Sequence, residues 1–332
     1  MKHTAIVTLF LIAIFFITQI VGLSLISKDI SQVSVDENNQ VQIQHSEGLQ
    51  EFRPQTTGAS SLIYILISIA IGTIVLLFLV KFRKVNVWKA WFFVAVLISI
   101  TIAFMVITQN LWASLAIAAV LAVLKIWRQN FIIHNFTEIF MYAGIAVLLV
   151  PIFNIIWALV LLGIISVYDV IAVWQSKHMV KMANFQTDSK VFAGLMIPYT
   201  RKKAGEDRPV PMEKLAKGKA SLKIPLPAKK MKKGKSGFTD QAIEIPDEEH
   251  KTAILGGGDV AFPLIFSGVV MENLIEHGLP KSTALLESFI IAGTTTLAIA
   301  ALFLLAKKDK FYPAMPIVTI GCLVGWGIIL LL

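Results

Sequence analysis

Long apolar runs constrain the fold of this chain more than any other feature of its sequence. Nine stretches are almost free of charge, at residues 4–26, 61–81, 87–108, 111–127, 135–153, 155–175, 254–275, 282–306 and 312–332. Most approach the ~20 residues that a helix needs to cross a bilayer. The composition agrees, because only 15% of the residues are charged, against about 25% in soluble domains. The sequence therefore predicts an all-α polytopic membrane protein with nine transmembrane helices.

Two long polar segments interrupt the runs, an acidic one at residues 28–60 and a lysine-rich one at 176–251. Outside the second segment, Lys and Arg divide 10 to 3 between alternate sides of the membrane. The positive-inside rule places the richer side in the cytoplasm. We therefore expect a multi-pass protein of the cell (cytoplasmic) membrane with its N-terminus inside and its C-terminus outside.

This topology divides the chain into three sections. Helices 1–6 fall in residues 1–175, with residues 28–60 as an extracellular loop, and helices 7–9 fall in residues 252–332. Between them, residues 176–251 form a long cytoplasmic loop that carries 17 of the 30 Lys and Arg residues. Its few aromatic residues argue against nucleic-acid binding, so we interpret it as a flexible loop beside anionic membrane lipid. An apolar piece within it, residues 191–199, is expected to dock on the membrane or on the helices.

Two aspartates, Asp169 and Asp259, are the only ones that lie well inside apolar runs. A carboxylate at membrane depth is costly and therefore indicates a functional site. Each lies about six residues from the cytoplasmic end of its run, roughly 9 Å deep at 1.5 Å per residue. The matched depth predicts that the two carboxyl groups can face each other.

The backbone near both aspartates is predicted to be irregular. Three consecutive glycines directly precede Asp259, namely Gly256, Gly257 and Gly258. They disfavour helix and allow an extended segment that lines a wet cavity. The ninth run begins at the same cytoplasmic level with the sequence Pro313, Ala314, Met315, Pro316. Its two prolines remove backbone donors and disturb the helix start.

Two carboxyl groups in a narrow, dry site hold one proton between them. One then takes a proton from water while the other polarises a carbonyl and protonates the leaving amine. Such a pair hydrolyses peptide bonds without a metal ion or another cofactor. Other polar residues in the runs are expected to be structural: Glu138, Glu272 and Glu287 solvated at span ends, and His134 and Asn154 in caps or interfaces.

These residues resemble the motifs of the presenilin and signal peptide peptidase family of intramembrane aspartyl proteases, most of all in its archaeal members. Tyr168 and Asp169 match the tyrosine–aspartate motif, and the glycines with Asp259 match GxGD. Pro313, Ala314 and Met315 match the proline–alanine–leucine motif. The likeness extends over the whole chain in helix number, motif order and the long loop.

The resemblance implies several further properties. Asp169 and Asp259 are the catalytic pair, and Tyr168, Leu255, the glycines and residues 313–316 support the site or bind substrate. Substrates are single-pass transmembrane proteins, and the chain acts alone or as a homo-oligomer without a cofactor. Two departures stand out: Gly257, where presenilins often have leucine, is expected to loosen the approach to Asp259, and Met315 replaces leucine.

The substrate helix must unwind before it is cut. We expect the extended Thr252–Leu255 edge to pair with it as an added strand, and proline at Ile254 or Leu255 to block cleavage without unfolding the protein.

Three other activities fit parts of the pattern less well. A proton- or cation-coupled transporter also uses intramembrane carboxylates and broken helices, but no repeat places the glycines and prolines at corresponding positions of two halves. A prepilin-peptidase-like enzyme also has a GxGD aspartate, yet no cysteine-rich zinc segment occurs here. A serine intramembrane protease is disfavoured because the chain has no GxSG.

Overall fold

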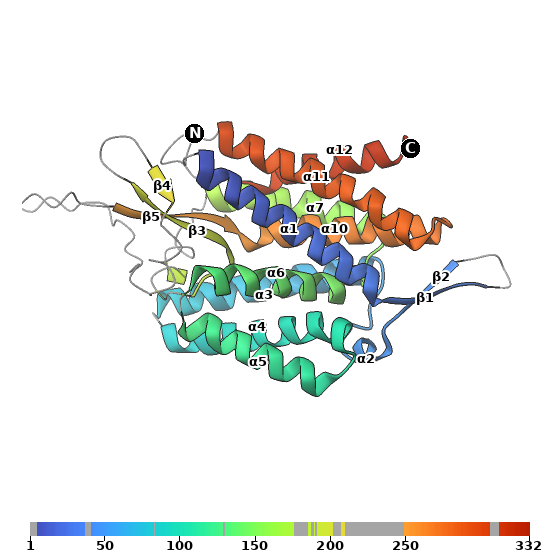
Figure 1. The fold of residues 1–332 in the computed structure, drawn as a ribbon, viewed down its shortest axis with the longest axis horizontal. Helices are drawn as coiled ribbons and strands as arrows, with labels where there is room; N and C mark the ends of the chain where they lie inside the picture. The colour runs from blue at the N-terminus through green and yellow to red at the C-terminus, as the bar shows by residue number, and fades with distance from the viewer. Residues whose placement is uncertain are drawn as a thin grey trace, which may run out of the picture.

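The chain forms a bundle of long helices with a small sheet at each of two opposite ends (Figure 1). The computed structural model describes residues 5–36, 41–82, 84–128, 130–175, 185, 186, 189, 191–201, 207–209, 249–305 and 312–332. Most of the 176–251 loop therefore lies outside the described residues. The described parts of that loop include strands, one of which packs against the helices next to the site.

Seven segments are long and apolar enough to cross a membrane. They are α1 (Ala5–Asp29), α3 (Ala59–Lys81), α4 (Val85–Thr108), α6 (Phe131–Leu149) with η1 (Val150–Ile152), α7 (Ile155–Val170) with η2 (Ile171–Gln175), α10 (Gly257–Glu276) and α11 (Lys281–Leu305). Two further apolar helices, α5 (Leu111–Trp127) and α12 (Met315–Ile329), are shorter. The short helix α2 (Glu47–Gln50) lies between the spans. Seven of the nine predicted spans are thus helices of spanning length, and the other two are shorter apolar helices.

Helix α10 is the centre of the bundle. It packs against α1, α6, α7, α11 and α12. Of the most apolar 18-residue stretch of this helix, 78% is buried. An apolar helix in a membrane protein can also face lipid, as α3 does with only 11% of its corresponding stretch buried, so the burial of α10 comes from the helices that surround it. Its position places the first turn of α10, with Asp259, beside the last turn of α7 and the start of α12.

Helices α4 and α6 approach closely at Gly144. A Cβ atom added at Gly144 would overlap the Ser99 carbonyl oxygen and would lie 3.2 Å from the Ala103 nitrogen. Small residues allow such backbone approach in membrane helix pairs. The packing of these two helices therefore depends on the missing side chain.

We expect Gly144→Val to destabilise the protein by about 2 kcal/mol or more, because the obstructing atoms belong to backbone that cannot move aside. Thermal unfolding in detergent measures the effect. Gly72→Ala on α3 is the control, because no atom lies within 4 Å of its added Cβ. An equal melting temperature for Gly144→Val and wild type would contradict the close-packing argument.

The two sheets lie at opposite ends of the helices (Figure 1). At one end β1 (Ile30–Val35) pairs antiparallel with β2 (Val41–His45). At the other, β3 (Gly194–Arg201) lies between β4 (Asp207–Pro209) and β5 (Glu249–Gly256), and both pairings are antiparallel. β3 contains most of the apolar piece of the long loop, and it docks on α6 and α1. The docking expected for residues 191–199 is thus on the helices.

Candidate active site

Asp169 lies at the end of α7, where the α-helix changes to the π-helical turn η2. Wider turns of this kind are frequent at functional sites. The side chain is only 5% exposed, and its Oδ2 accepts a hydrogen bond of 3.1 Å from the Met315 backbone N–H. The N–H of Ala314 also donates to this carboxyl group.

The sequence from Pro313 to Pro316 explains why these donors are available. Ala314 is the N-cap of α12, and Met315 is its first residue. The first amides of a helix have no partner within the helix, and they attract negative charge. Neither proline has an N–H, so the two amides between them are the donors directed at Asp169. Part of this motif therefore binds the aspartate itself, not an incoming peptide.

Asp259 lies in the first turn of α10 and is 8% exposed. The seventh helix begins at Gly257, later than the apolar run suggested, because residues 249–256 form β5. Gly256 is extended, with φ −62° and ψ 146°. A Cβ added at Gly256 would lie 3.1 Å from Asp259 Oδ2. The carboxyl group therefore turns back over Gly256, between strand and helix.

The two aspartates come together because α7, α10 and α12 pack against one another. Their carboxyl groups interact electrostatically across the α7–α10 contact. A hydrogen bond of 2.7 Å between the hydroxyl groups of Ser166 and Thr319 joins α7 to α12 nearby. The side chain of Gln19 on α1 donates to the Val260 carbonyl oxygen at 3.0 Å, so a third contact holds the start of α10.

The remaining residues expected at the site lie around this pair. Leu255 is buried in β5 opposite Leu195, whereas Tyr168, next to Asp169, is 37% exposed. A Cβ added at Gly258 would meet only the Phe262 ring, at 3.5 Å or more. Gln19, Ser166 and Thr319 were missed by sequence reasoning. Gln19 could have been found, because it is a lone glutamine within an apolar span. Ser166 and Thr319 could not, because a single hydroxyl residue in such a span is common.

Gly257 is not a point of flexibility, as the sequence suggested, but a point of close packing. A Cβ added there would lie 2.5 Å from the Tyr142 hydroxyl oxygen and 3.1 Å from two ring carbons. Tyr142 on α6 thus occupies the space that a larger residue at position 257 requires. The departure from leucine at this motif position has a steric explanation.

If the chain has the proteolytic activity expected from its sequence, Gly257→Ala should lower that activity by about tenfold or more, since the first turn of α10 must move to relieve the overlap. Tyr142→Phe in the same chain removes the nearest oxygen and leaves a tight contact of 3.1 Å. The double variant is therefore expected to recover most of the activity in a cleavage assay. Equal loss in single and double variants would show that Tyr142 is not the obstructing group.

The expectation that Glu138 and Glu272 are solvated at span ends is wrong, because both side chains are buried. Glu138 pairs with Lys125 of α5. Glu272 lies 3.6 Å from His45, whose other ring nitrogen is 3.0 Å from Asp29. Burial replaces water differently at the two sites: Glu138 gains an ion pair, whereas Glu272 Oε1 has no hydrogen-bond partner among the described residues. Asn154 caps α7 as expected, accepting a hydrogen bond from Trp157 N–H.

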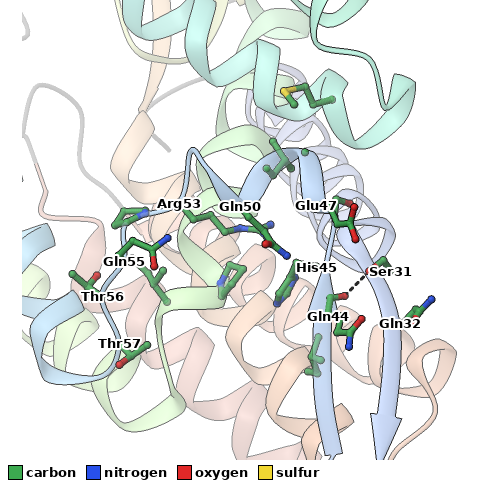
Figure 2. Close-up of a pocket in the computed structure, with 18 of the residues that line it drawn as sticks. Ser31, Gln32, Gln44, His45, Glu47, Gln50, Arg53, Gln55, Thr56 and Thr57 are labelled. Atoms are coloured by element: carbon green, nitrogen blue, oxygen red, sulfur yellow. Dashed lines mark hydrogen bonds between the residues drawn. The ribbon is translucent and has the colours of Figure 1, made fainter.

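A cleft of about 850 Å³ lies at the opposite end of the bundle, beside the β1–β2 hairpin. His45 and Arg53 are among its lining residues (Figure 2). Arg53 and His45 both bind Asp29, at the end of α1. Amide and hydroxyl side chains make up about half of the cleft's lining residues, which include neither Asp169 nor Asp259. Among the described residues, no group of three or more His, Cys, Asp or Glu is arranged to hold a metal ion.

The described apolar helices point to a multi-pass integral membrane protein, in which two buried aspartates lie near each other. A sequence profile described as signal-peptide peptidase, presenilin aspartyl protease matches residues 12–204. Because the match covers more than half of the chain, the protein belongs to this family and is an aspartic-type intramembrane endopeptidase. The match includes Asp169 but not Asp259.

Two solved structures have the same fold. Both are described as a presenilin family intramembrane aspartate protease, one in space group C222 and the other in P2. The first has a TM-score of 0.52 and 14% identity and covers 97% of this chain and 99% of its own. The second has a TM-score of 0.53 and 15% identity and covers 97% and 96%. No curated protein sequence matches.

Proposed function

We propose that this protein hydrolyses peptide bonds within the transmembrane segments of single-pass membrane proteins, with Asp169 and Asp259 as its catalytic residues. One observation carries the proposal: two buried aspartates from α7 and α10 interact at one end of the bundle, and the start of α12 holds one of them. Two interacting carboxyl groups supply an acid and a base at the same time.

The proposed reaction needs only this pair and one water molecule. The ionised carboxylate takes a proton from water while the protonated carboxyl group donates one to the scissile carbonyl oxygen. The resulting tetrahedral diol collapses, its C–N bond breaks, and a proton passes to the leaving amine. In this step the carboxyl group that took the proton from water supplies the amine proton. The other carboxylate takes a proton from a diol hydroxyl, so that a carboxylic acid forms and the dyad again holds a single proton. The backbone amides of Ala314 and Met315 orient Asp169 throughout.

The free edge of β5 is the proposed binding site for the unwound substrate. No other described strand pairs with β5 on the side away from β3. An extended peptide adds to such an edge through backbone hydrogen bonds. β5 runs directly into Gly256 and the turn that carries Asp259, so a peptide bound along it leads to the dyad. A substrate helix satisfies its own backbone, and pairing with β5 replaces some of those bonds.

We further propose that α5 and α12 also cross the membrane, which gives nine spans with a cytoplasmic N-terminus and an extracellular C-terminus. Residues 1–175 then carry helices 1–6, and residues 252–332 carry helices 7–9. The loop 176–251 lies in the cytoplasm between helices 6 and 7, next to membrane lipid. The dyad lies at the cytoplasmic end of the bundle in this arrangement. The protein works as a single chain or a homo-oligomer in the cell membrane.

Proteoliposomes containing the purified protein distinguish proteolysis from cation-coupled transport. A labelled single-span substrate in the same bilayer is expected to yield two fragments, with no accumulation of solute in the vesicles. Gel separation of the label and an interior pH dye measure the two activities in parallel. Uptake of protons or cations without fragments, in a protein shown to be folded by circular dichroism, would replace the protease with the transporter.

A further inference from the structure

A stripe of buried polar side chains runs along α6 from strand β3 to the glycine segment that precedes Asp259. His134, Glu138 and Tyr142 are four residues apart and share one helix face, and Asn135 is adjacent. All four side chains are buried. Buried ionisable groups in a membrane helix are costly and face the interior of the bundle.

The N-terminal part of the stripe, formed by His134, Asn135 and Glu138, binds the backbone of β3. Asn135 makes both possible bonds to Met196: its Nδ2 donates to the carbonyl oxygen at 2.7 Å, and its Oδ1 accepts from the N–H at 3.0 Å. Gly194 is held in the same way by two side chains. Its N–H donates to Glu138 Oε2 at 3.2 Å, and its carbonyl oxygen lies 2.8 Å from His134 Nε2.

These four contacts replace a missing neighbouring strand. Both backbone polar groups of a strand residue point to the same side, and successive residues alternate. Gly194 and Met196 therefore direct their backbone groups toward α6. Residues 195, 197 and 199 direct theirs toward their β5 partners 255, 253 and 251. On β5 itself, the backbone groups of Thr252, Ile254 and Gly256 are left on the free edge.

The acceptor for Gly194 is held in place by a buried charge. Lys125 of α5 forms an ion pair with Glu138 and donates to the Thr137 hydroxyl at 3.2 Å. Both charged groups are buried, so neither exchanges its partner for water. Removing one partner alone would leave the other as an uncompensated buried charge.

Tyr142, at the C-terminal end of the stripe, reaches the glycine segment at residues 256–258. Tyr142 packs against Gly257, which β5 leads into. Gly194, at the start of β3, lies opposite Gly256 in the sheet. One face of α6 thus contacts both sides of the strand pair close to Asp259.

We propose that Asn135, His134 and Glu138, with Lys125, form a positioning site that sets the register of β3 and, through it, the free edge of β5. The proposal rests on the proposed function, in which that edge receives the substrate. None of these side chains touches reacting atoms; they act through β3. The site pre-forms the sheet before any substrate binds.

Disulfide trapping reports the register directly. Met196 and Ile254 are opposite each other and, by the alternation above, form a non-hydrogen-bonded pair with a Cα separation of about 4.5 Å. That separation lies within the range that a disulfide accepts. The native Cys322 is buried and does not compete. We expect Met196→Cys/Ile254→Cys to cross-link readily under mild oxidation in the full-length protein without substrate.

Two matched variants separate positioning from simple loss of the ion pair. Lys125→Met/Glu138→Gln removes both charges but keeps an amide oxygen that accepts from Gly194. Lys125→Met/Glu138→Leu removes the same charges and the acceptor. We expect the first to cross-link and cleave nearly as wild type. The second is expected to cross-link at least about tenfold more slowly, with a similar fall in cleavage measured without the added cysteines, because the Gly194 N–H is unpaired.

Asn135→Leu tests the same register without touching the ion pair, and it is expected to behave like the leucine double variant. It also decides the question if that double variant does not fold, as judged by circular dichroism. Thr295→Val on α11 is the control, since this buried hydroxyl bonds only its own helix. Equal cross-linking rates for Asn135→Leu, the double variants and wild type would overturn the proposal, as would equal losses in the glutamine and leucine variants.

The failure of the proposed function is visible separately. Asp169→Asn is expected to abolish cleavage while cross-linking stays at the wild-type rate, since the Asp169 side chain bonds the start of α12. Cleavage that survives in Asp169→Asn would contradict the catalytic assignment and leave the register result standing.

Discussion

Asp169→Asn and Asp259→Asn are each expected to lower cleavage of a single-span substrate by at least about a thousandfold, the upper range for general acid–base catalysis. Asparagine keeps the size of the side chain and its ability to accept the Met315 hydrogen bond. It cannot take a proton from water or hold the shared proton of the pair. The packing of α7, α10 and α12 should therefore survive while the chemistry is lost.

Purified variants in detergent, compared at equal concentration by fragment yield, measure this effect. Asp36→Asn is the matched control, because Asp36 follows β1 at the far end of the bundle. It is expected to cleave as wild type. Substantial cleavage by either site variant would remove that aspartate from the mechanism.

Ile254→Pro is expected to reduce cleavage by about a hundredfold while the protein stays folded. Proline removes the backbone N–H, and at position 254 this donor lies on the free edge of β5, not on the edge bound to β3. The loss therefore falls on the contact with the unwound substrate. Ile254→Val, which keeps the N–H and most of the side chain, should remain active.

The equivalent change at Leu255 is different, which corrects the sequence-based expectation that both positions are equivalent. Its N–H points toward Leu195 in the alternation of the sheet, so Leu255→Pro breaks the β3–β5 pairing as well. Limited proteolysis and thermal unfolding should show damage for Leu255→Pro and not for Ile254→Pro. Wild-type cleavage by a folded Ile254→Pro would rule out strand addition at β5.

The helices and the two aspartates were predictable because membrane burial imposes strong rules on composition. An apolar run of about 20 residues has few alternatives to a helix, and a carboxylate within it stands out. Matching the depth of Asp169 and Asp259 then needed only the helix rise and the topology. The prolines around Ala314 and Met315 also gave the place of the irregular helix start.

The polar residues that support the site were not predictable in the same way. Glu138 lies near the end of its apolar run, where contact with water is the ordinary expectation, and its partner Lys125 is on another helix. The sheet was hidden because β3 lies in a lysine-rich loop and pairs with a strand about 55 residues further along the chain. Gly257 was read as flexible since its neighbour, Tyr142, is distant in sequence. The burial of Glu138, the β3–β5 pairing and the packing at Gly257 all depend on contacts between segments that are far apart in the sequence.

Mass spectrometry of the fragments tests the central claim most directly. A purified single-span substrate is incubated in proteoliposomes with wild type or with the Asp169→Asn/Asp259→Asn double variant, and both new termini are sequenced. We predict that wild type cuts a peptide bond inside the hydrophobic segment of the substrate and that the double variant yields no such fragments. Cuts only outside that segment, or the same cut by the double variant, would contradict intramembrane cleavage by this aspartate pair.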